Sequence, residues 1–173
     1  MTRAPTSRVL TVALFSFALL AIAAVGARSF EAPKDRPILT ISGKIQNTNR
    51  DGTAQFDRAM LEALGLVTIE TSTPWYSGPV KFEGVLLEKL MQAVGANGDR
   101  VVAVALNDYS TEIPISDFQR FSPILALKRN GEYMPVRDKG PLFIIYPYDR
   151  VPELKSQTYY GRSAWQVSQI VVK

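Results

Sequence analysis

The chain has 173 residues, 46% of them hydrophobic, and a formal net charge of +4. This length suits one domain with a core of its own. The sequence contains no cysteine and no histidine, which excludes disulfides, thiolate nucleophiles, Ser-His triads and metal sites built from these two residue types. The basic residues are scattered, with Lys128-Arg129 as an adjacent pair, so the clustered footprint of a nucleic-acid-binding protein is missing.

The first 27 residues have the three-part composition of a secretory signal. Arg3 and Arg8 give a positive start, the run from Val9 to Val25 is almost wholly apolar, and Val25-Gly26-Ala27 offers small residues for cleavage. We therefore expect a periplasmic or secreted protein that keeps no stable membrane span once residues 1–27 are removed. The alternative is an uncleaved anchor, because an apolar run of about 17 residues is near the lower limit for spanning a bilayer.

After a polar linker over residues 28–37, we expect one domain over residues 38–173. Its first half predicts two strands alternating with two amphipathic helices. In chain order these are the strand Ile38–Ile45, the helix Ala54–Leu64 capped by Thr53, the strand Leu66–Thr71 and the helix Val85–Val94. Gly65 and Gly95 are typical helix stops. The stretch Ser72–Val80 contains two prolines and a glycine, and it predicts a loop.

The second half is richer in strands. Val101–Leu106 is apolar on both faces and predicts a central strand. An Asn130-Gly131 turn between two β-rich runs predicts a hairpin over residues 124–136. The remaining elements are a short extended piece at Ile113–Ile115, a helical turn at Asp117–Arg120 capped by Ser116, a buried strand at Leu142–Tyr146, an irregular polar segment at Pro152–Tyr160, and a last strand at Trp165–Val172 with Trp165 and Val167 on one side. Several strands with two clear helices indicate an α+β domain with a mixed sheet.

Five segments carry motifs that recur together in one protein family. They are Phe82–Leu90, Asn107-Asp-Tyr109 with the Ile113-Pro-Ile115 step, Ile124–Pro135, Asp138–Pro147 and Ser163–Ile170. In this order they resemble the molybdopterin-binding domain of sulfite-oxidase-type oxidoreductases. The resemblance covers most of residues 38–172, and it implies a single compact domain with that family's mixed-sheet fold.

The chain departs from the family where the family holds its metal. The family's molybdenum is bound by a cysteine thiolate, and the resemblance places Thr71-Ser-Thr-Pro-Trp75 at that position. A hydroxyl is a poor substitute for a soft thiolate ligand. At the start of the Asp138–Pro147 segment, Lys139 keeps a basic charge where the family has one, whereas Phe143 does not. We therefore assign no catalytic residue and no metal ligand and expect no cofactor, molybdopterin being implied by the resemblance alone.

Nine residues are the candidates for ligand binding: Thr71, Ser72, Thr73, Trp75, Asn107, Asp108, Tyr109, Arg137 and Lys139. Each has a structural alternative. The three hydroxyls can bind an oxyanion or form a polar turn, and Trp75 suits an interface because aromatic residues are enriched there. Asn107-Asp108 can face a ligand or form an Asx turn, and Tyr109 can stack on a ligand or close the core. Arg137 and Lys139 can recognise an anion or form a solvated turn.

Two main function classes follow from these residues. The first is an exported, non-catalytic binding module that kept the fold, lost the metal ligand and recognises a small anionic ligand or a protein partner. The second is a molybdopterin-dependent oxidoreductase with cysteine-free metal coordination. The absence of cysteine and histidine favours the binding module, and a purely structural envelope protein is a third class. A Tyr/Arg-rich region near the C-terminus suits either recognition or packing over the sheet edge: Tyr146, Tyr148, Asp149, Arg150, Tyr159, Tyr160 and Arg162.

Overall fold

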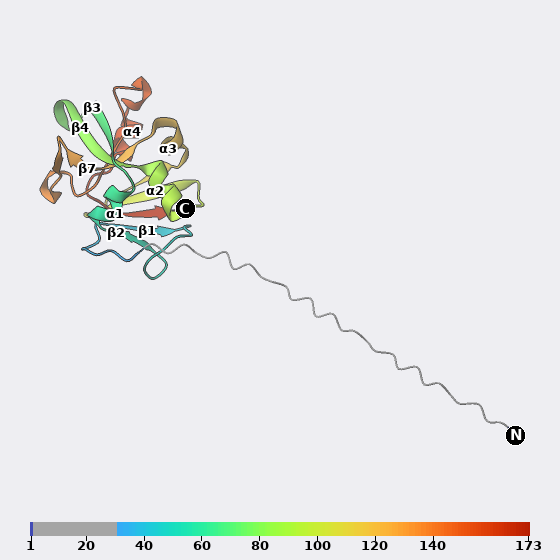
Figure 1. Cartoon of the computed structure of the whole chain (residues 1–173). Helices are drawn as coiled ribbons and strands as arrows, with labels where there is room; N and C mark the ends of the chain where they lie inside the picture. The colour runs from blue at the N-terminus through green and yellow to red at the C-terminus, as the bar shows by residue number, and fades with distance from the viewer. Residues whose placement is uncertain (2–30) are drawn as a thin grey trace.

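The computed structural model describes Met1 and residues 31–173. The predicted signal segment therefore lies, apart from Met1, outside the described residues. The described part folds into two five-stranded sheets and four short α-helices. None of these helices is long and apolar enough to cross a membrane. Figure 1 shows β1 and β2 at one end of the domain and the β3–β4 hairpin at the other.

The first sheet is mixed, as the sequence predicts. Its strand order is β2-β1-β10-β5-β6, where β1 pairs with β10 in parallel and the other neighbours are antiparallel. The strands are β1 (Leu39–Gly43), β2 (Ala54–Phe56), β5 (Arg100–Ala105), β6 (Ser110–Pro114) and β10 (Val167–Val172). The prediction that Val101–Leu106 forms a central strand is confirmed, because β5 lies between β10 and β6.

The second sheet is antiparallel and built around β7, which pairs with β4, β8 and β9. Its strands are β3 (Val67–Thr73), β4 (Tyr76–Leu86), β7 (Ile124–Arg129), β8 (Glu132–Tyr133) and β9 (Phe143–Ile145). The predicted Asn-Gly hairpin is confirmed as β7–β8, and the predicted buried strand as β9. A single bridge between Phe143 and Trp165 continues this sheet towards the C-terminal segment.

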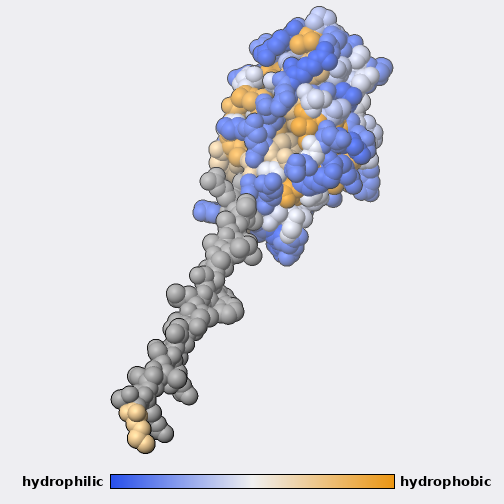
Figure 2. Space-filling view, turned by 90° about the vertical axis from the view of Figure 1, so that its right-hand side faces the viewer, coloured by the Kyte–Doolittle hydropathy of each residue, from blue (hydrophilic) through white to orange (hydrophobic). Residues whose placement is uncertain are grey.

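The helices are α1 (Arg58–Ala63), α2 (Leu87–Val94), α3 (Ser116–Phe121) and α4 (Gln157–Arg162), with 3₁₀ turns at Val136–Asp138 and Pro152–Leu154. The apolar stripe of α2 enters the main core, in which Leu87, Leu90 and Val94 are fully buried. A smaller cluster covers the other face of the second sheet. Successive residues of β7 alternate between the two clusters, as side chains of a strand with two covered faces must. On the surface view in Figure 2, apolar patches lie among larger hydrophilic areas.

The prediction of a helix over Ala54–Leu64 was wrong at its start. Residues Ala54–Phe56 form β2 and pair with β1, because Ala54 and Phe56 alternate into the core. The helix begins only after Asp57, whose carboxylate accepts a hydrogen bond of 2.8 Å from the backbone N–H of Met60. Asp57 is thus the N-cap in place of Thr53. Its pKa is lowered, first by this hydrogen bond.

The predicted loop at Ser72–Val80 and the start of the second helix were also wrong. Tyr76–Leu86 is one long strand, and α2 begins at Leu87. Turn-forming residues led to the loop prediction, but β3 and β4 pair closely enough to hold Pro79 opposite Ser72. Gly84 belongs to the strand because the neighbouring chain passes very close. A Cβ at this position would lie 2.2 Å from the carbonyl oxygen of Leu125.

Three further corrections concern the second half of the chain. Ser116 lies inside α3, and the capping residue is Ile115. The segment predicted to be irregular, Pro152–Tyr160, contains a 3₁₀ turn and most of α4. Trp165 does not share a face of the last strand with Val167, because Gln166 between them has a positive φ of 54°. Trp165 therefore bridges to β9 in the second sheet, while Val167 begins β10 in the first.

Candidate functional site

A cavity of about 350 Å³ lies where the two sheets and α4 meet. Three of the predicted ligand-binding residues line it: Trp75 from the β3–β4 turn, and Asn107 and Tyr109 from the β5–β6 loop. The rest of its lining comes from the end of β5, from α4 and from the segment that follows α4: Ala105, Gln157, Tyr160, Gly161, Ser163 and Trp165. The sequence prediction therefore identified one side of the cavity and missed the α4 side as part of a site.

Four of the nine lining residues are aromatic, and the Trp75 ring contacts the rings of two others. The Trp75 ring lies 5.8 Å from the Trp165 ring at an interplanar angle of 74°, and 6.0 Å from the Tyr160 ring at 77°. It also packs edge-on against Phe143 at 5.2 Å. Phe143 is fully buried, whereas Trp165 is 38% exposed. This packing anchors Trp75 in the core and leaves the cavity bounded by rings that stand nearly perpendicular to one another.

The β5–β6 loop is held by a local hydrogen-bond pattern. The Asn107 side chain accepts a hydrogen bond from the backbone N–H of Tyr109, and the Asp108 N–H donates to the carbonyl of Ala105. This is an Asx turn, and it leaves Asp108 exposed with a φ of 64°. Tyr109 is 50% exposed, so the alternative that it closes the core was wrong. Its hydroxyl donates to the carbonyl of Gly161, which links the loop to α4.

The three hydroxyl residues at the expected thiolate position do not line the cavity. Thr71 is only 1% exposed, and its hydroxyl oxygen accepts a hydrogen bond from the backbone N–H of Asp149. The N–H of Ser72 donates to the Asp149 carboxylate, and the Thr73 hydroxyl accepts from the N–H of Trp75. A hydrogen bond from Lys155, followed by that from Ser72, lowers the pKa of Asp149 to about 2. These hydrogen bonds link the Thr71–Thr73 segment to Asp149 and to Trp75 within the protein.

The two predicted cations lie in different places. Arg137 is exposed and borders a separate depression beside β8. Lys139 has a φ of 63°, and its Nζ lies 5.1 Å from the Tyr76 ring centre and 5.5 Å from that of Trp165. Within residues 31–173, the Lys139 ammonium has no hydrogen bond and no ion pair. It is therefore a cation in contact with the Tyr76 and Trp165 rings, and it lies next to a cavity residue without lining the cavity itself.

The carboxylate next to Lys139 feels its charge but makes its direct contacts with other groups. Asp138 makes an ion pair of 2.7 Å with Arg129 and accepts a hydrogen bond of 3.1 Å from the Tyr76 hydroxyl. Burial acts to raise the pKa of Asp138, but the hydrogen bonds from Tyr76 and Arg129 outweigh it and the pKa is lowered. Asp138 is therefore ionised, and its direct partners are Arg129 and Tyr76.

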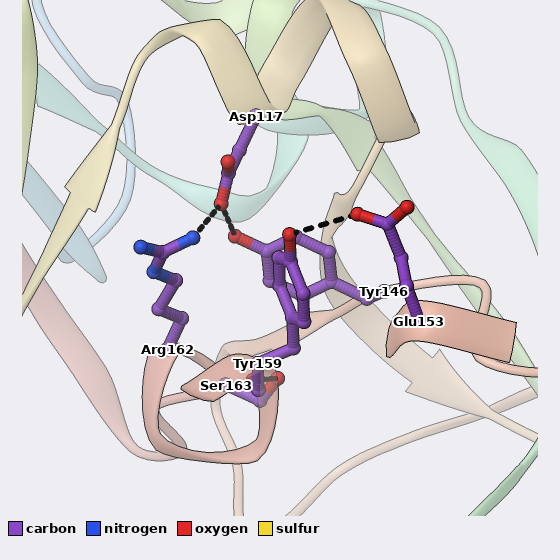
Figure 3. A network of polar contacts seen from close by, with 6 residues as sticks. All are labelled: Asp117, Tyr146, Glu153, Tyr159, Arg162 and Ser163. Carbon is purple, nitrogen blue, oxygen red and sulfur yellow. Dashed lines mark hydrogen bonds and ion pairs between the residues drawn. The ribbon is translucent and has the colours of Figure 1, made fainter. Parts of the chain in front are cut away.

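A buried polar network holds α4 against the core (Figure 3). The Asp117 carboxylate, on α3, accepts hydrogen bonds of 2.8 Å from both the Tyr146 hydroxyl and the Arg162 guanidinium. Ser163 donates to the carbonyl of Tyr159 and also shares a hydrogen bond with the Tyr148 hydroxyl. Burial raises the pKa of both Tyr146 and Tyr148. The Tyr/Arg-rich region therefore packs and positions the cavity wall.

The residues present do not fit a thiolate-bound molybdenum. The sequence supplies no cysteine, and Thr71, at the expected position, is turned into the structure towards Asp149. Among the described residues, no three His, Cys, Asp or Glu side chains converge on a position that could hold a metal ion. The cavity lining itself carries no charged side chain. The site thus offers aromatic faces, amides and one nearby ammonium.

This architecture is that of an α+β domain with a cavity at the end of a central strand. The family model for the oxidoreductase molybdopterin binding domain matches residues 46–149, and the chain belongs to this family. The resemblance inferred from the five motifs is confirmed. No curated protein matches the chain. The matched range contains Trp75 and the β5–β6 loop but ends before α4 and Trp165, so five of the nine residues that line the cavity lie outside it.

Proposed function

We propose that the protein is an exported, non-catalytic binding domain of this family, and that its cavity holds a small ligand. The observation that carries the proposal is the contrast between two neighbouring positions. In the Thr71–Trp75 segment, which the resemblance sets against the family's thiolate loop, Thr71 is buried and bound to Asp149. Beside it, the rings of Trp75, Tyr160 and Trp165 bound an open cavity. The signal-like composition of residues 1–27 supports export.

A small ligand suits this cavity better than a protein partner. Its volume of about 350 Å³ falls in the usual range for small-molecule sites, which are concave and mostly apolar with a few polar groups. Asn107 and Gln157 supply amide groups to the lining. Lys139, without a carboxylate partner of its own, supports a ligand that carries an anionic group.

The test is the molybdenum and pterin content of the protein purified from a host that exports it and makes the cofactor. The proposal predicts folded protein, judged by cooperative thermal unfolding, with no stoichiometric molybdenum and no pterin released on denaturation. A family member that has the cysteine, produced in the same host, is the control and must load its metal. One molybdenum per chain together with released pterin would show that the protein is a cofactor-bearing oxidoreductase.

A further inference from the structure

Resting on that proposed function, we infer the chemical class of the ligand. We propose that the cavity binds a small zwitterion, with a quaternary ammonium group between the aromatic rings and an anionic group at Lys139. Three features favour this class: the steep angles between the rings, the absence of charge from the described lining, and the Lys139 cation next to Trp165.

The ring geometry favours a rounded group over a flat one. A flat heterocycle can stack in an offset parallel arrangement on one ring, but it cannot lie parallel to two rings that stand nearly perpendicular to each other. Trp75 stands at 74° to Trp165 and at 77° to Tyr160. All three rings line the cavity, two of them nearly perpendicular to Trp75, and Tyr109 borders the same space. A trimethylammonium group is compact, and it can contact several perpendicular ring faces at once.

The electrostatics favour a positive charge on that group. The face of an aromatic ring carries negative potential, and Trp is the ring that attracts cations most strongly, as in the aromatic cages that recognise quaternary ammonium ligands. No carboxylate lines the described cavity, so a simple cation would lack a counter-charge there. A zwitterion brings its own anion, and this anion also offsets the repulsion between its ammonium and Lys139.

Lys139 is suitably placed to receive that anion. Its Nζ lies 5.5 Å from the Trp165 ring centre, and the backbone N–H of Gln166 donates to the Lys139 carbonyl, which fixes Lys139 beside the Trp165 segment. Because Asp138 is paired with Arg129 at 2.7 Å, the Lys139 ammonium is free to bind a phosphate or a carboxylate.

The cavity is built before the ligand arrives. Asp117 holds Arg162 and Tyr146 at 2.8 Å each, and this network fixes the end of α4 that carries Tyr160 and Gly161. A preformed site loses little conformational entropy on binding, so modest contacts give measurable affinity.

The chain is well suited to a direct binding test, because its two tryptophans, Trp75 and Trp165, both line the cavity. Intrinsic fluorescence therefore reports on the site without a label. The full chain is titrated with phosphocholine and with 3,3-dimethylbutyl phosphate, which has the same shape but no positive charge. We expect saturable binding of phosphocholine, confirmed by calorimetry, at least about tenfold tighter than that of the analogue without the ammonium charge. Equal affinity for the two compounds would overturn the proposal.

Lys139 is tested with a matched pair of variants. Phosphocholine should bind at least about threefold more tightly than choline, since choline lacks the anionic group. Lys139→Gln should abolish this preference. Arg137→Gln removes the same charge two residues away, on an exposed side chain beside another depression, and should leave the preference intact. If Lys139→Gln still prefers phosphocholine over choline, Lys139 does not bind the anionic group.

A blocking variant separates loss of binding from loss of folding. Gly161 lines the cavity, and a Cβ added there meets no atom within 4 Å. Gly161→Leu should therefore fill the cavity while the thermal unfolding midpoint stays equal or rises, because leucine favours helix. Phosphocholine binding that is unchanged in this folded variant would place the ligand elsewhere and contradict the proposal.

Two further titrations identify the source of the ligand and separate this inference from the function it rests on. Binding to phosphatidylcholine vesicles would indicate a lipid headgroup, and binding to free phosphocholine or glycine betaine alone would indicate a soluble zwitterion. Failure of all three would overturn the ligand class. If the protein is nevertheless free of molybdenum, the proposed binding function stands; if it carries molybdenum and pterin, that function fails as well.

Discussion

The Thr71–Thr73 segment and the cavity next to it differ in how their functional groups are used. In the segment, the buried Thr71 hydroxyl and the Ser72 N–H are both bound to Asp149, and the Thr73 hydroxyl is bound to Trp75. In the cavity, by contrast, Trp75, Tyr160, Trp165 and Gln157 line an open space. Thr71 therefore has a structural role, whereas the aromatic rings beside it line an open space.

The largest expected effect comes from removing Asp117, whose hydrogen bonds hold α4 at the cavity wall. Asp117 is 6% exposed and is the common acceptor for Arg162 and Tyr146. Asp117→Ala leaves a largely buried guanidinium without its counter-charge, which costs about 3 kcal/mol. Urea unfolding measures the loss, and the tryptophan emission of the folded variant should shift as α4 loosens.

The matched control for Asp117→Ala is Arg120→Ala. This change breaks the exposed ion pair of 2.9 Å between Arg120 and Glu153 on the same two regions of the chain. It should change the free energy of unfolding by less than about 0.5 kcal/mol, because exposed pairs contribute little. Equal losses for the two variants would show that the buried network does not hold the wall.

The next effect tests the structural role of Thr71. Thr71→Val removes the acceptor of the Asp149 N–H at 3.0 Å and should destabilise the fold by about 1 kcal/mol. Thr71→Ser keeps the hydroxyl and should retain most of the stability. Fluorescence titration should give the same ligand affinity for both variants, since Thr71 does not line the cavity. A specific loss of binding in Thr71→Val would show that the Thr71–Thr73 segment contributes to the binding site.

The pH dependence of stability tests how far the Asp149 carboxylate stabilises the same segment. The pKa of Asp149 is lowered to about 2 in the folded protein, against about 4 for a free aspartate. Its ionised form therefore stabilises the fold above roughly pH 4, and this contribution is lost as the pH falls towards 2. The pair with Lys155 is well exposed, so we expect a difference of at most about 1 kcal/mol.

The measurement compares urea unfolding of the wild type and Asp149→Asn at pH 6 and at pH 2.5. The wild type should lose more stability than the variant over this interval. Identical losses would mean that the carboxylate does not stabilise the Thr71–Ser72 segment.

The smallest expected effect on stability concerns Gly161 in α4, at the cavity wall. Gly161 lies within α4 with open space at its Cβ position. Gly161→Ala should stabilise the protein by about 0.5 kcal/mol through helix propensity and the lower entropy of the unfolded chain. Thermal unfolding measures the gain. A loss of stability would mean that α4 is not helical around Gly161.

The sequence predicted the fold well because its strongest signals are local or ordered along the chain. The Asn130-Gly131 turn specified the β7–β8 hairpin, and the five motifs in order specified the family. Local signals also caused the errors. Turn-forming residues at Ser72–Val80 concealed the β3–β4 hairpin, whose pairing is set by the partner strand. The apolar residues of Ala54–Phe56 fit a helix as well as a strand, and the Asp57 cap decides between them.

The site was predicted only on the side that local signals mark. Trp75, Asn107 and Tyr109 stand out as polar or aromatic residues in turns, and all three line the cavity. Tyr160, Gly161 and Ser163 reach it through contacts distant in sequence, such as the Arg162–Asp117 bond that spans 45 positions. Trp165 was assigned to the last strand because the positive φ of Gln166 leaves no trace in the sequence pattern. The Tyr/Arg-rich composition was the one available signal for this wall.

The measurement that tests the central claim most directly is the molar ratio of molybdenum to protein, determined by mass spectrometry on protein from an exporting, cofactor-producing host. A binding domain whose metal position has become structural should be folded at a ratio near zero, while the cysteine-bearing control from the same host approaches one. A ratio near one for this chain, with pterin released on denaturation, would contradict the account.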